Sequence, residues 1–209
     1  MGLARIALPA ILGMSLAFLL ALPMARLRIR TGTWGVVVRE SASLVERLVR
    51  WSIVVVFVAL VTWTALCAAL GPKPLAVWPQ WPGVGWLGIS IAAGGFALVA
   101  AAQAKMGRSW RIGIDDHPTA LVTDGVFARI RHPIYTGIQS IVLGITCIAP
   151  SPWTLAGFAL TLMLVNVQSR LEEQHLRQQH GAAFYEWASQ VGRFVPRLGR
   201  LRPPGGARQ

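Results

Sequence analysis

The amino-acid sequence predicts an all-α, polytopic membrane protein with about five transmembrane helices, a tight C-terminal helical hairpin and cytoplasmic amphipathic helices. The chain has 209 residues, of which 54% are hydrophobic, and its mean hydropathy is +0.53. Ordinary soluble domains are less apolar. The apolar residues gather in five runs and the basic residues gather between them, which is the charge pattern of a membrane protein.

Five apolar runs are expected to cross the membrane: Ile6–Met24, Leu48–Leu70, Val84–Ala104, Ile134–Ala149 and Trp153–Ser169. The first run resembles a signal peptide, but its cleavage site, Ala21-Leu22-Pro23, is weak, so we expect a retained helix. The last two runs are short. The fourth run reaches only about 24 Å as a helix, whereas the hydrocarbon core measures about 30 Å. These two helices are expected to thin the bilayer or to lie partly inside the bundle.

The fourth and fifth runs are expected to form an antiparallel hairpin, because only the turn Pro150-Ser151-Pro152 joins them. Gly137 and Gly144 share one face of the fourth run. Small residues on a membrane helix let a neighbouring helix approach closely. We therefore expect tight packing along that face.

The rest of the chain is expected to lie at the inner membrane surface. After Glu173, spaced apolar residues predict two short amphipathic helices, separated at Gly181. We divide the chain into three N-terminal transmembrane helices (residues 1–104), a core with the helical hairpin (105–196) and a disordered basic tail (197–209).

The charges of the connecting segments predict the orientation. The segments Ala25–Trp51, Lys105–His132 and Arg170–Gln209 contain eighteen of the twenty Lys and Arg residues, and the opposite side has only Arg5 and Lys73. The positive-inside rule therefore places the N-terminus outside and the C-terminus in the cytoplasm. Abundant arginine and alanine further indicate a GC-rich bacterial gene, and hence the bacterial inner membrane.

The same division predicts where polar chemistry takes place. All eight acidic residues and all four histidines lie on the predicted inner side. The outer side has an aromatic belt typical of the membrane interface, formed by Trp78, Trp81, Trp86 and Trp153. A polar site is therefore expected to face the cytoplasm.

Composition argues against several classes of partner. The net charge of +12 would suit nucleic-acid binding, but the basic residues follow the membrane pattern, so we expect membrane lipids as partners and no nucleic acid. Cys67 and Cys147 lie in apolar runs without a CxxC or Cys/His cluster, so no metal site or disulfide framework is expected. No GxGxxG sequence follows a predicted strand, which gives no support to a Rossmann nucleotide site.

One polar cluster opens the fourth run, from Arg131 to Gly137. Pro133 favours a helix start, whose free N–H groups and positive dipole end attract anions. His132 and Tyr135 add an imidazole and a hydroxyl. The alternative is a lipid-headgroup anchor, in which Arg131 snorkels and Tyr135 lies at the interface.

A second cluster, Glu172-Glu173, closes the fifth run. Carboxylates at the C-terminal end of a helical span are disfavoured by the helix dipole, and a cationic ligand would offset this. The alternative is a solvated pair beside Arg170 or Arg177. Glu172-x-x-His175 matches half of a di-iron motif, but no second copy is present.

The loop before the fourth run, residues 107–127, is expected to act either as an extended lid over a ligand or as an ordinary basic connector. Thr123-Asp124-Gly125 predicts a turn within it.

Taken together, these motifs resemble the isoprenylcysteine carboxyl methyltransferase family, to which the phospholipid N-methyltransferases are related. The matching motifs are Leu121-Val122-x-x-Gly125-x-Phe127, Arg131-His132-Pro133-x-Tyr135-x-Gly137, Glu172-Glu173-x-x-Leu176 and Gly181-x-x-Phe184-Tyr185. The resemblance covers roughly residues 107–196, and the first two spans match only in hydropathy.

The resemblance implies an integral membrane methyltransferase that uses S-adenosylmethionine in a cytoplasm-facing pocket, so that 105–196 would be the cofactor-binding core. The cofactor residues that it implies are Thr119, Ala120, Leu121, Val122, Phe127, His132, Pro133, Ile134, Tyr135 and Glu172. It leaves the catalytic residues open. Candidate substrate contacts are Arg131, Gln168, Arg170 and Glu173.

One departure from the family bears on the methyl acceptor. The eukaryotic prenylcysteine enzymes have an arginine linked to substrate one turn before the first glutamate, where this chain has Gln168, with Arg170 two residues later. The expected acceptor is a lipophilic or small molecule, such as a carboxylate, with a phospholipid or amine as the alternative. A non-catalytic carrier or assembly protein on the same scaffold is the alternative of another class. A carrier would have polar residues at mid-membrane depth, and this chain has few.

Overall fold

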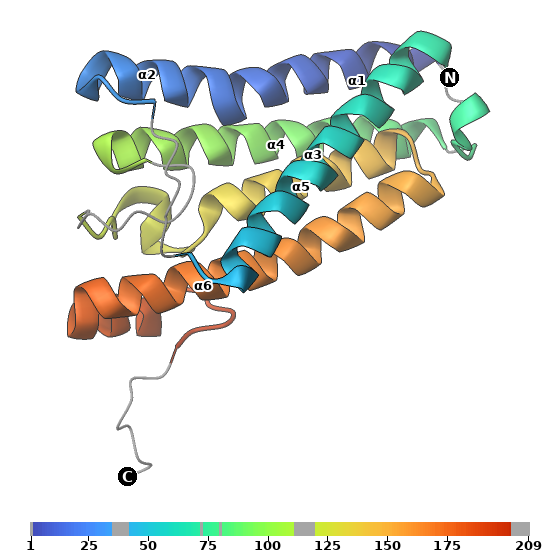
Figure 1. Cartoon of the computed structure of the whole chain (residues 1–209). Coiled ribbons are helices and arrows are strands. Elements are labelled where there is room, and N and C mark those ends of the chain that lie inside the picture. The colour runs from blue at the N-terminus through green and yellow to red at the C-terminus, as the bar shows by residue number, and fades with distance from the viewer. Residues whose placement is uncertain (1, 35–41, 72, 80, 111–119, 202–209) are drawn as a thin grey trace.

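The computed structural model describes residues 2–34, 42–71, 73–79, 81–110 and 120–201, and these residues form a helical bundle without β-strands (Figure 1). Its main helices are α1 (Gly2–Ser15), α2 (Leu22–Thr31), α3 (Leu44–Leu70), α4 (Pro82–Met106), α5 (Pro133–Ile148) and α6 (Pro152–Gln190). Short helical turns are η1 (Leu16–Ala21), η2 (Lys73–Leu75), η3 (Gly107–Ser109) and η4 (Gly125–Ala128).

The length and composition of the helices agree with a multi-pass membrane protein. Among the described residues, four helical stretches are long and apolar enough to cross a membrane, and α5 is a shorter apolar helix. The predicted second and third spans correspond to α3 and α4. The predicted start of the fourth span at Pro133 is confirmed, because α5 begins at that residue.

The first span is one continuous rod that contains a π-helical turn. It extends over Leu3–Ile29, longer than the predicted Ile6–Met24. Proline lacks an N–H and its ring clashes with the carbonyl four residues earlier. The π turn η1 ends just before Pro23, and the N–H of Leu22 bonds to the carbonyl of Ala17 instead of an α-helical partner. The wider turn thus lets the helix continue through the proline.

The predicted break at Gly181 is confirmed. Element α6 spans Pro152–Gln190, but Gly181 has non-helical angles (φ 51°, ψ −122°), so two helices meet there across a kink. The sequence did not predict that the fifth span continues without interruption into the first amphipathic helix, as far as Gly181. Between Ser169 and Gly181 the sequence contains neither proline nor glycine and is rich in good helix formers, so nothing ends the helix at the membrane surface. Gly181, with its positive φ, bends the chain there.

Helices α4 and α5 pack very closely through glycines on both sides. A Cβ atom at Gly144 would lie 2.5 Å from the carbonyl oxygen of Gly88, and one at Gly137 would lie 2.7 Å from that of Gly95. Any side chain there would force the helices apart. The predicted close approach along the Gly137 and Gly144 face is therefore confirmed, with α4 as the neighbour.

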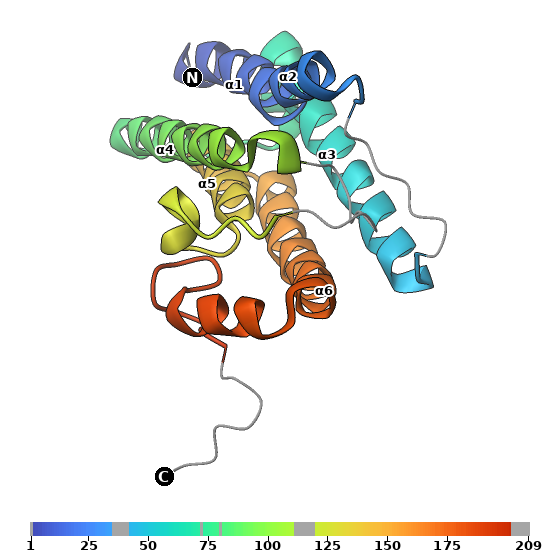
Figure 2. The same ribbon diagram turned by 90° about the vertical axis from the view of Figure 1, so that its left-hand side faces the viewer.

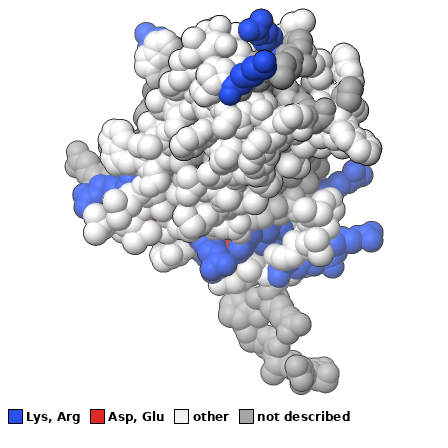
Figure 3. All heavy atoms as spheres, turned by 90° about the vertical axis from the view of Figure 1, so that its right-hand side faces the viewer, with Lys and Arg blue, Asp and Glu red and all other residues white. Residues whose placement is uncertain are grey.

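The arrangement of helices leaves α5 in the middle of the bundle. Figure 2 views the bundle along its axis, with α5 between α4 and α6 and with α3 at one side. Figure 3 shows the opposite end, a largely uncharged surface with Lys and Arg at its margins. The four tryptophans predicted for the outer interface are all exposed, from 47% for Trp78 to 84% for Trp81.

Candidate functional site

The two polar clusters predicted from sequence meet at one end of the α5–α6 hairpin. Helix α5 runs from Pro133 to the turn at Pro150, and α6 returns from it, so the start of α5 lies beside the second half of α6. There His132 and Tyr135 contact Glu172 and Glu173. Residues 37 to 42 positions apart in sequence thus form one group.

His132 lies between the two carboxylates. Its Nδ1 is 3.5 Å from Glu172 Oε2 and its Nε2 is 3.3 Å from Glu173 Oε1. The imidazole also stacks on Tyr135, with ring centroids 5.7 Å apart, and contacts Phe194 at 5.9 Å. Burial opposes a charge on this ring, but the hydrogen bonds to Glu172 and Glu173 outweigh burial and raise the pKa of His132 above 6.5.

Glu172 is the carboxylate that remains accessible. Its side chain is 28% exposed, whereas that of Glu173 is fully buried. Tyr135 donates a short hydrogen bond to Glu172, and Gln168 Nε2 donates another over 3.2 Å. These neighbours fix the position of the carboxylate while leaving part of it open to a ligand.

Glu173 is a buried ionic hub. Arg193 donates to it from Nε at 3.0 Å and from Nη2 at 2.6 Å, Arg131 from Nε at 3.0 Å and Arg177 from Nη2 at 3.4 Å. A buried carboxylate is tolerated only when such partners compensate its charge. This arrangement favours a structural role for Glu173 over contact with substrate.

Arg131 ties the C-terminal segment to the start of α5. Besides Glu173, its fully buried guanidinium donates to the carbonyls of Ala188, Val191 and Gly199, at 3.0, 2.5 and 2.7 Å. With these bonds made, Arg131 is engaged in the fold and not directed at an acceptor.

Backbone hydrogen bonds make a second connection between the start of α5 and the C-terminal segment. The N–H of Arg131 donates to the carbonyl of Gly192 over 2.8 Å, and that of His132 to the carbonyl of Arg193 over 3.0 Å. We call residues 191–201, with these bonds, the C-terminal clasp. Residues 197–201 lie in the clasp, where Leu201 bonds to Ala188, so the expectation of disorder from residue 197 does not hold for them. Residues 202–209 lie outside the described part of the chain.

The loop before α5 is described only in part. Thr119 and most of the predicted lid, residues 111–119, lie outside the described residues. Ala120 is exposed, and Leu121 and Val122 are partly buried. Phe127 is buried in η4, and its carbonyl accepts a hydrogen bond from Trp187 Nε1 over 3.0 Å.

The loop is also attached to α4. Lys105 Nζ lies 2.6 Å from Asp124 Oδ2, in the predicted turn. The hydrogen bond from Lys105 lowers the pKa of the exposed Asp124 carboxyl. Asp124 and Phe127, in the described part of the loop, are thus tied to α4 and α6 respectively.

The sequence interpretation did not single out Arg193 and Phe194. Both follow α6 in a stretch without periodicity, and their neighbours are set by the bend at Gly181 and by the clasp. Ile134 and Pro133 occupy the first turn of α5, and Arg170 is exposed on α6. Among the described residues, no group of three or more His, Cys, Asp or Glu side chains could hold a metal.

The chemistry of the site suits a ligand with both positive and negative groups. The partly exposed Glu172 suits an ammonium group or ribose hydroxyls. No side chain caps the start of α5, so its N-terminal end suits a carboxylate. The residues present therefore fit S-adenosylmethionine, which has both kinds of group.

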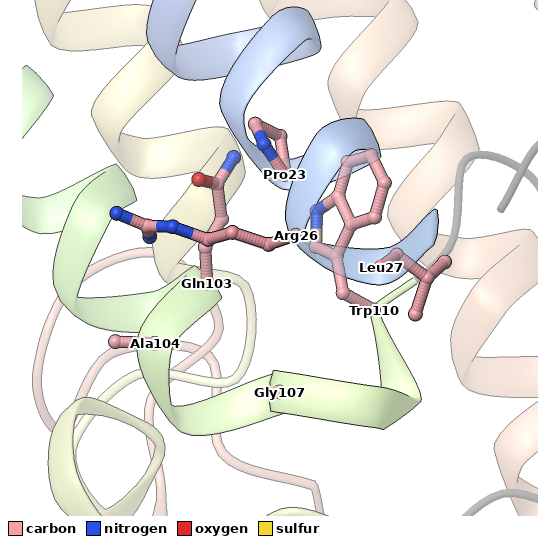
Figure 4. Close-up of a pocket in the computed structure, with 7 residues that line it drawn as sticks. All are labelled: Pro23, Arg26, Leu27, Gln103, Ala104, Gly107 and Trp110. Atoms are coloured by element: carbon pink, nitrogen blue, oxygen red, sulfur yellow. The ribbon is translucent and has the colours of Figure 1, made fainter. Parts of the chain in front are cut away.

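A separate cavity of about 140 Å³ lies between α2 and α4 (Figure 4). It is lined by Pro23, Arg26, Leu27, Gln103, Ala104, Gly107 and Trp110. None of these is a predicted cofactor residue. The cavity is small for a nucleoside ligand.

Comparisons with known proteins agree with this picture. Residues 84–183, from α4 to just beyond Gly181, match the family model described as phospholipid methyltransferase. The fold is similar to that of the eukaryotic intramembrane Ras methyltransferase ICMT (isoprenylcysteine carboxyl methyltransferase), with a TM-score of 0.56 and 20% sequence identity. The similarity covers 84% of this chain and 60% of that chain. No curated protein matches the chain.

The matched family segment includes both polar clusters and the hairpin that brings them together. This chain spans about three fifths of the length of the ICMT structure that it resembles. The family match thus covers slightly less than half of the chain, and the similarity to ICMT, at 20% identity, is one of fold.

Proposed function

We propose that this protein transfers a methyl group from S-adenosylmethionine to a lipophilic or small acceptor at the membrane surface. The observation that supports this most directly is the partly exposed Glu172 carboxylate, held by Tyr135 and Gln168 beside His132 and the uncapped start of α5. This group lies within the segment that matches the phospholipid methyltransferase family.

We assign to the cofactor the residues that the resemblance to the isoprenylcysteine carboxyl methyltransferases implies. They are Ala120, Leu121, Val122, Phe127, His132, Pro133, Ile134, Tyr135 and Glu172, and Thr119 is assigned with them from sequence. Glu172 accepts hydrogen bonds from the positively charged or hydroxyl end of the cofactor, and the α5 N-terminus binds its carboxylate. Tyr135 and Gln168 orient Glu172.

The role of the protein is mainly to position the reactants. S-adenosylmethionine supplies a methyl group already activated by its sulfonium, so the chain needs to align the acceptor and exclude water. No strong base is needed for a carboxylate acceptor. The helical hairpin admits the cofactor from the aqueous side and a lipophilic acceptor sideways from the bilayer.

The first acceptor class is a lipophilic carboxylate, as the name of ICMT indicates for that protein. The second is a phospholipid or another amine, which the name of the matching family favours. We place the site on the cytoplasmic side, with the N-terminus outside, because eighteen of the twenty Lys and Arg residues flank that side. The bacterial inner membrane remains our proposed location.

The decisive experiment combines purified protein with isotopically labelled S-adenosylmethionine and membrane lipid extract. We expect mass spectrometry to detect a labelled lipophilic product that is absent when Glu172→Ala protein is used. A labelled carboxyl ester would identify the first acceptor class, and a labelled N-methyl amine the second. Failure of the wild-type protein to bind S-adenosylmethionine in calorimetry would refute the proposal and return the scaffold to a carrier or assembly role.

A further inference from the structure

The carboxamide of Gln139, on α5, is left unpaired in the folded protein. Both its Nε2 and its Oε1 are shielded from solvent and have no hydrogen-bond partner. Buried polar groups are nearly always hydrogen-bonded, and leaving one unpaired costs free energy. Here a donor and an acceptor on the same side chain are unpaired together, which indicates a ligand that supplies both partners.

The position of Gln139 follows from the contacts of its neighbours. Gly137 packs against α4, which turns that face of α5 away from α6. Tyr135 bonds to Glu172 on α6, and Gln139 lies one helical turn beyond Tyr135 on the same face. Gln139 therefore lies on the α6 side of α5.

Helix α6 has a matching amide at the same depth. Gln168 lies one turn before Glu172 and donates to it over 3.2 Å. Because α5 and α6 run antiparallel, Gln139 and Gln168 both lie one turn deeper into the hairpin than the Tyr135–Glu172 pair. This is the membrane side of the residues assigned to the cofactor.

We propose that Gln139 binds an uncharged polar group of the methyl acceptor that both donates and accepts hydrogen bonds, such as an amide, and that lies apart from the carboxylate or amine that receives the methyl group. The inference rests on the proposed function, since it takes the neighbouring Glu172 to hold the cofactor. It adds a residue that selects the acceptor.

The chemistry of Gln139 sets this preference. Its NH₂ donates and its carbonyl accepts, so one ligand amide can pair with both atoms. A ligand carboxylate offers only acceptors and would face the Gln139 carbonyl oxygen with a negative charge. A ketone leaves the same oxygen without a donor. Gln139 as a whole residue is only partly buried, so the methylene part of its side chain reaches the surface of the bundle. From there, an apolar tail of the bound acceptor can extend into the bilayer.

Three probes with the same chain and nearly the same shape test this proposal: dodecanamide, 2-tridecanone and dodecanoate. Their affinities are measured by calorimetry on the full-length protein in detergent, with S-adenosylhomocysteine present. We expect wild-type protein to prefer the amide over both others. Gln139→Leu should weaken amide binding by about 5- to 160-fold, the equivalent of two neutral hydrogen bonds, and ketone binding by about 2- to 13-fold, the equivalent of one.

Asn166→Leu is the matched control. It also removes a carboxamide from an apolar helix, but Asn166 is exposed and already paired with the carbonyl of Leu162. This variant should retain the amide preference. An equal effect of Gln139→Leu on all three probes, or no amide preference in the wild type, including no binding of any probe, overturns the role of Gln139.

The proposed function and the proposed role of Gln139 are tested by different measurements. If the wild type does not bind S-adenosylmethionine in the absence of probes, the proposed function fails. If it binds S-adenosylmethionine, and Gln139→Leu changes neither cofactor affinity nor the order of the probes, only the acceptor assignment fails.

Discussion

Arg131 Nε donates to Glu173 Oε1 over 3.0 Å, and neither side chain has any exposed surface. This buried ion pair links the loop before α5 to the second half of α6. It therefore holds the hairpin together at the end opposite to its Pro150–Pro152 turn, where Glu172 and His132 lie.

Replacing Glu173 with Gln should strongly destabilise the fold. The change leaves Arg131 and Arg193 buried or partly buried without a compensating charge, and breaking a buried pair typically costs about 3–5 kcal/mol. Unfolding by denaturant in detergent measures the loss. Glu186→Gln, at an exposed position of α6, is the control and should be nearly neutral. Equal stability of both variants would show that Glu173 is not the hub described here.

Replacing Glu172 with Ala should weaken S-adenosylmethionine binding while the fold remains intact. Loss of one charge-assisted hydrogen bond is equivalent to about 1.5–3 kcal/mol, or about 10- to 150-fold in affinity. Calorimetry measures the change. Wild-type affinity in a properly folded variant would argue against Glu172 as a ligand.

Replacing His132 with Ala should reduce methyl transfer sharply, while the protein still inserts into the membrane and purifies normally. The ring lies between Glu172 and Glu173. Its loss removes a partner of Glu172, the carboxylate that is proposed to bind the cofactor. If His132 only anchored the span, insertion or stability would change and cofactor binding would not. Wild-type turnover on an identified acceptor would therefore contradict its place in the pocket.

The stability of the protein should fall as pH rises above the range in which His132 is protonated. Its pKa is raised above 6.5 by Glu172 and Glu173 against the opposing effect of burial, so the protonated ring stabilises the fold. This contribution is fully present below pH 6.5 and is lost as pH rises through the raised pKa. Melting curves from pH 6 upward should show a smaller decline for His132→Gln. Parallel declines in both proteins would exclude this coupling.

The two termini should lie on opposite sides of the membrane. Reporter fusions after Gln209 and after Lys73 should give opposite compartments, with the Gln209 fusion in the cytoplasm, because of the eighteen-to-two charge division. A shared compartment would exclude the topology with five spans.

Much of the fold is predictable from the sequence because membrane helices follow local rules. Apolar length gives α3 and α4, and Pro133 marks the start of α5. The glycines at 137 and 144 indicate close packing, but only the structure identifies α4 as the neighbour. The long continuation of α6 was missed because a loss of hydropathy after Ser169 marks the membrane surface and not the end of a helix.

The candidate site was likewise predictable from the sequence only in part. The approach of His132 and Tyr135 to Glu172 follows from the tight hairpin turn, which fixes the ends of both helices. The binding of Arg131 by the carbonyls of Ala188, Val191 and Gly199 could not be predicted, since it depends on the bend at Gly181 and on irregular backbone. An arginine in a motif is equally compatible with a substrate contact.

The C-terminal clasp has a consequence for biosynthesis. The chain is made from its N-terminus, so α5 and the first part of α6 exist before residues 191–201 leave the ribosome. Until then the Arg131 guanidinium lacks the carbonyls of Val191 and Gly199, and Glu173 lacks Arg193. The end of the hairpin that carries His132 and Glu172 is thus completed only after residues 191–201 have been synthesised, and a nascent chain that stops before the clasp has the spans but lacks these contacts.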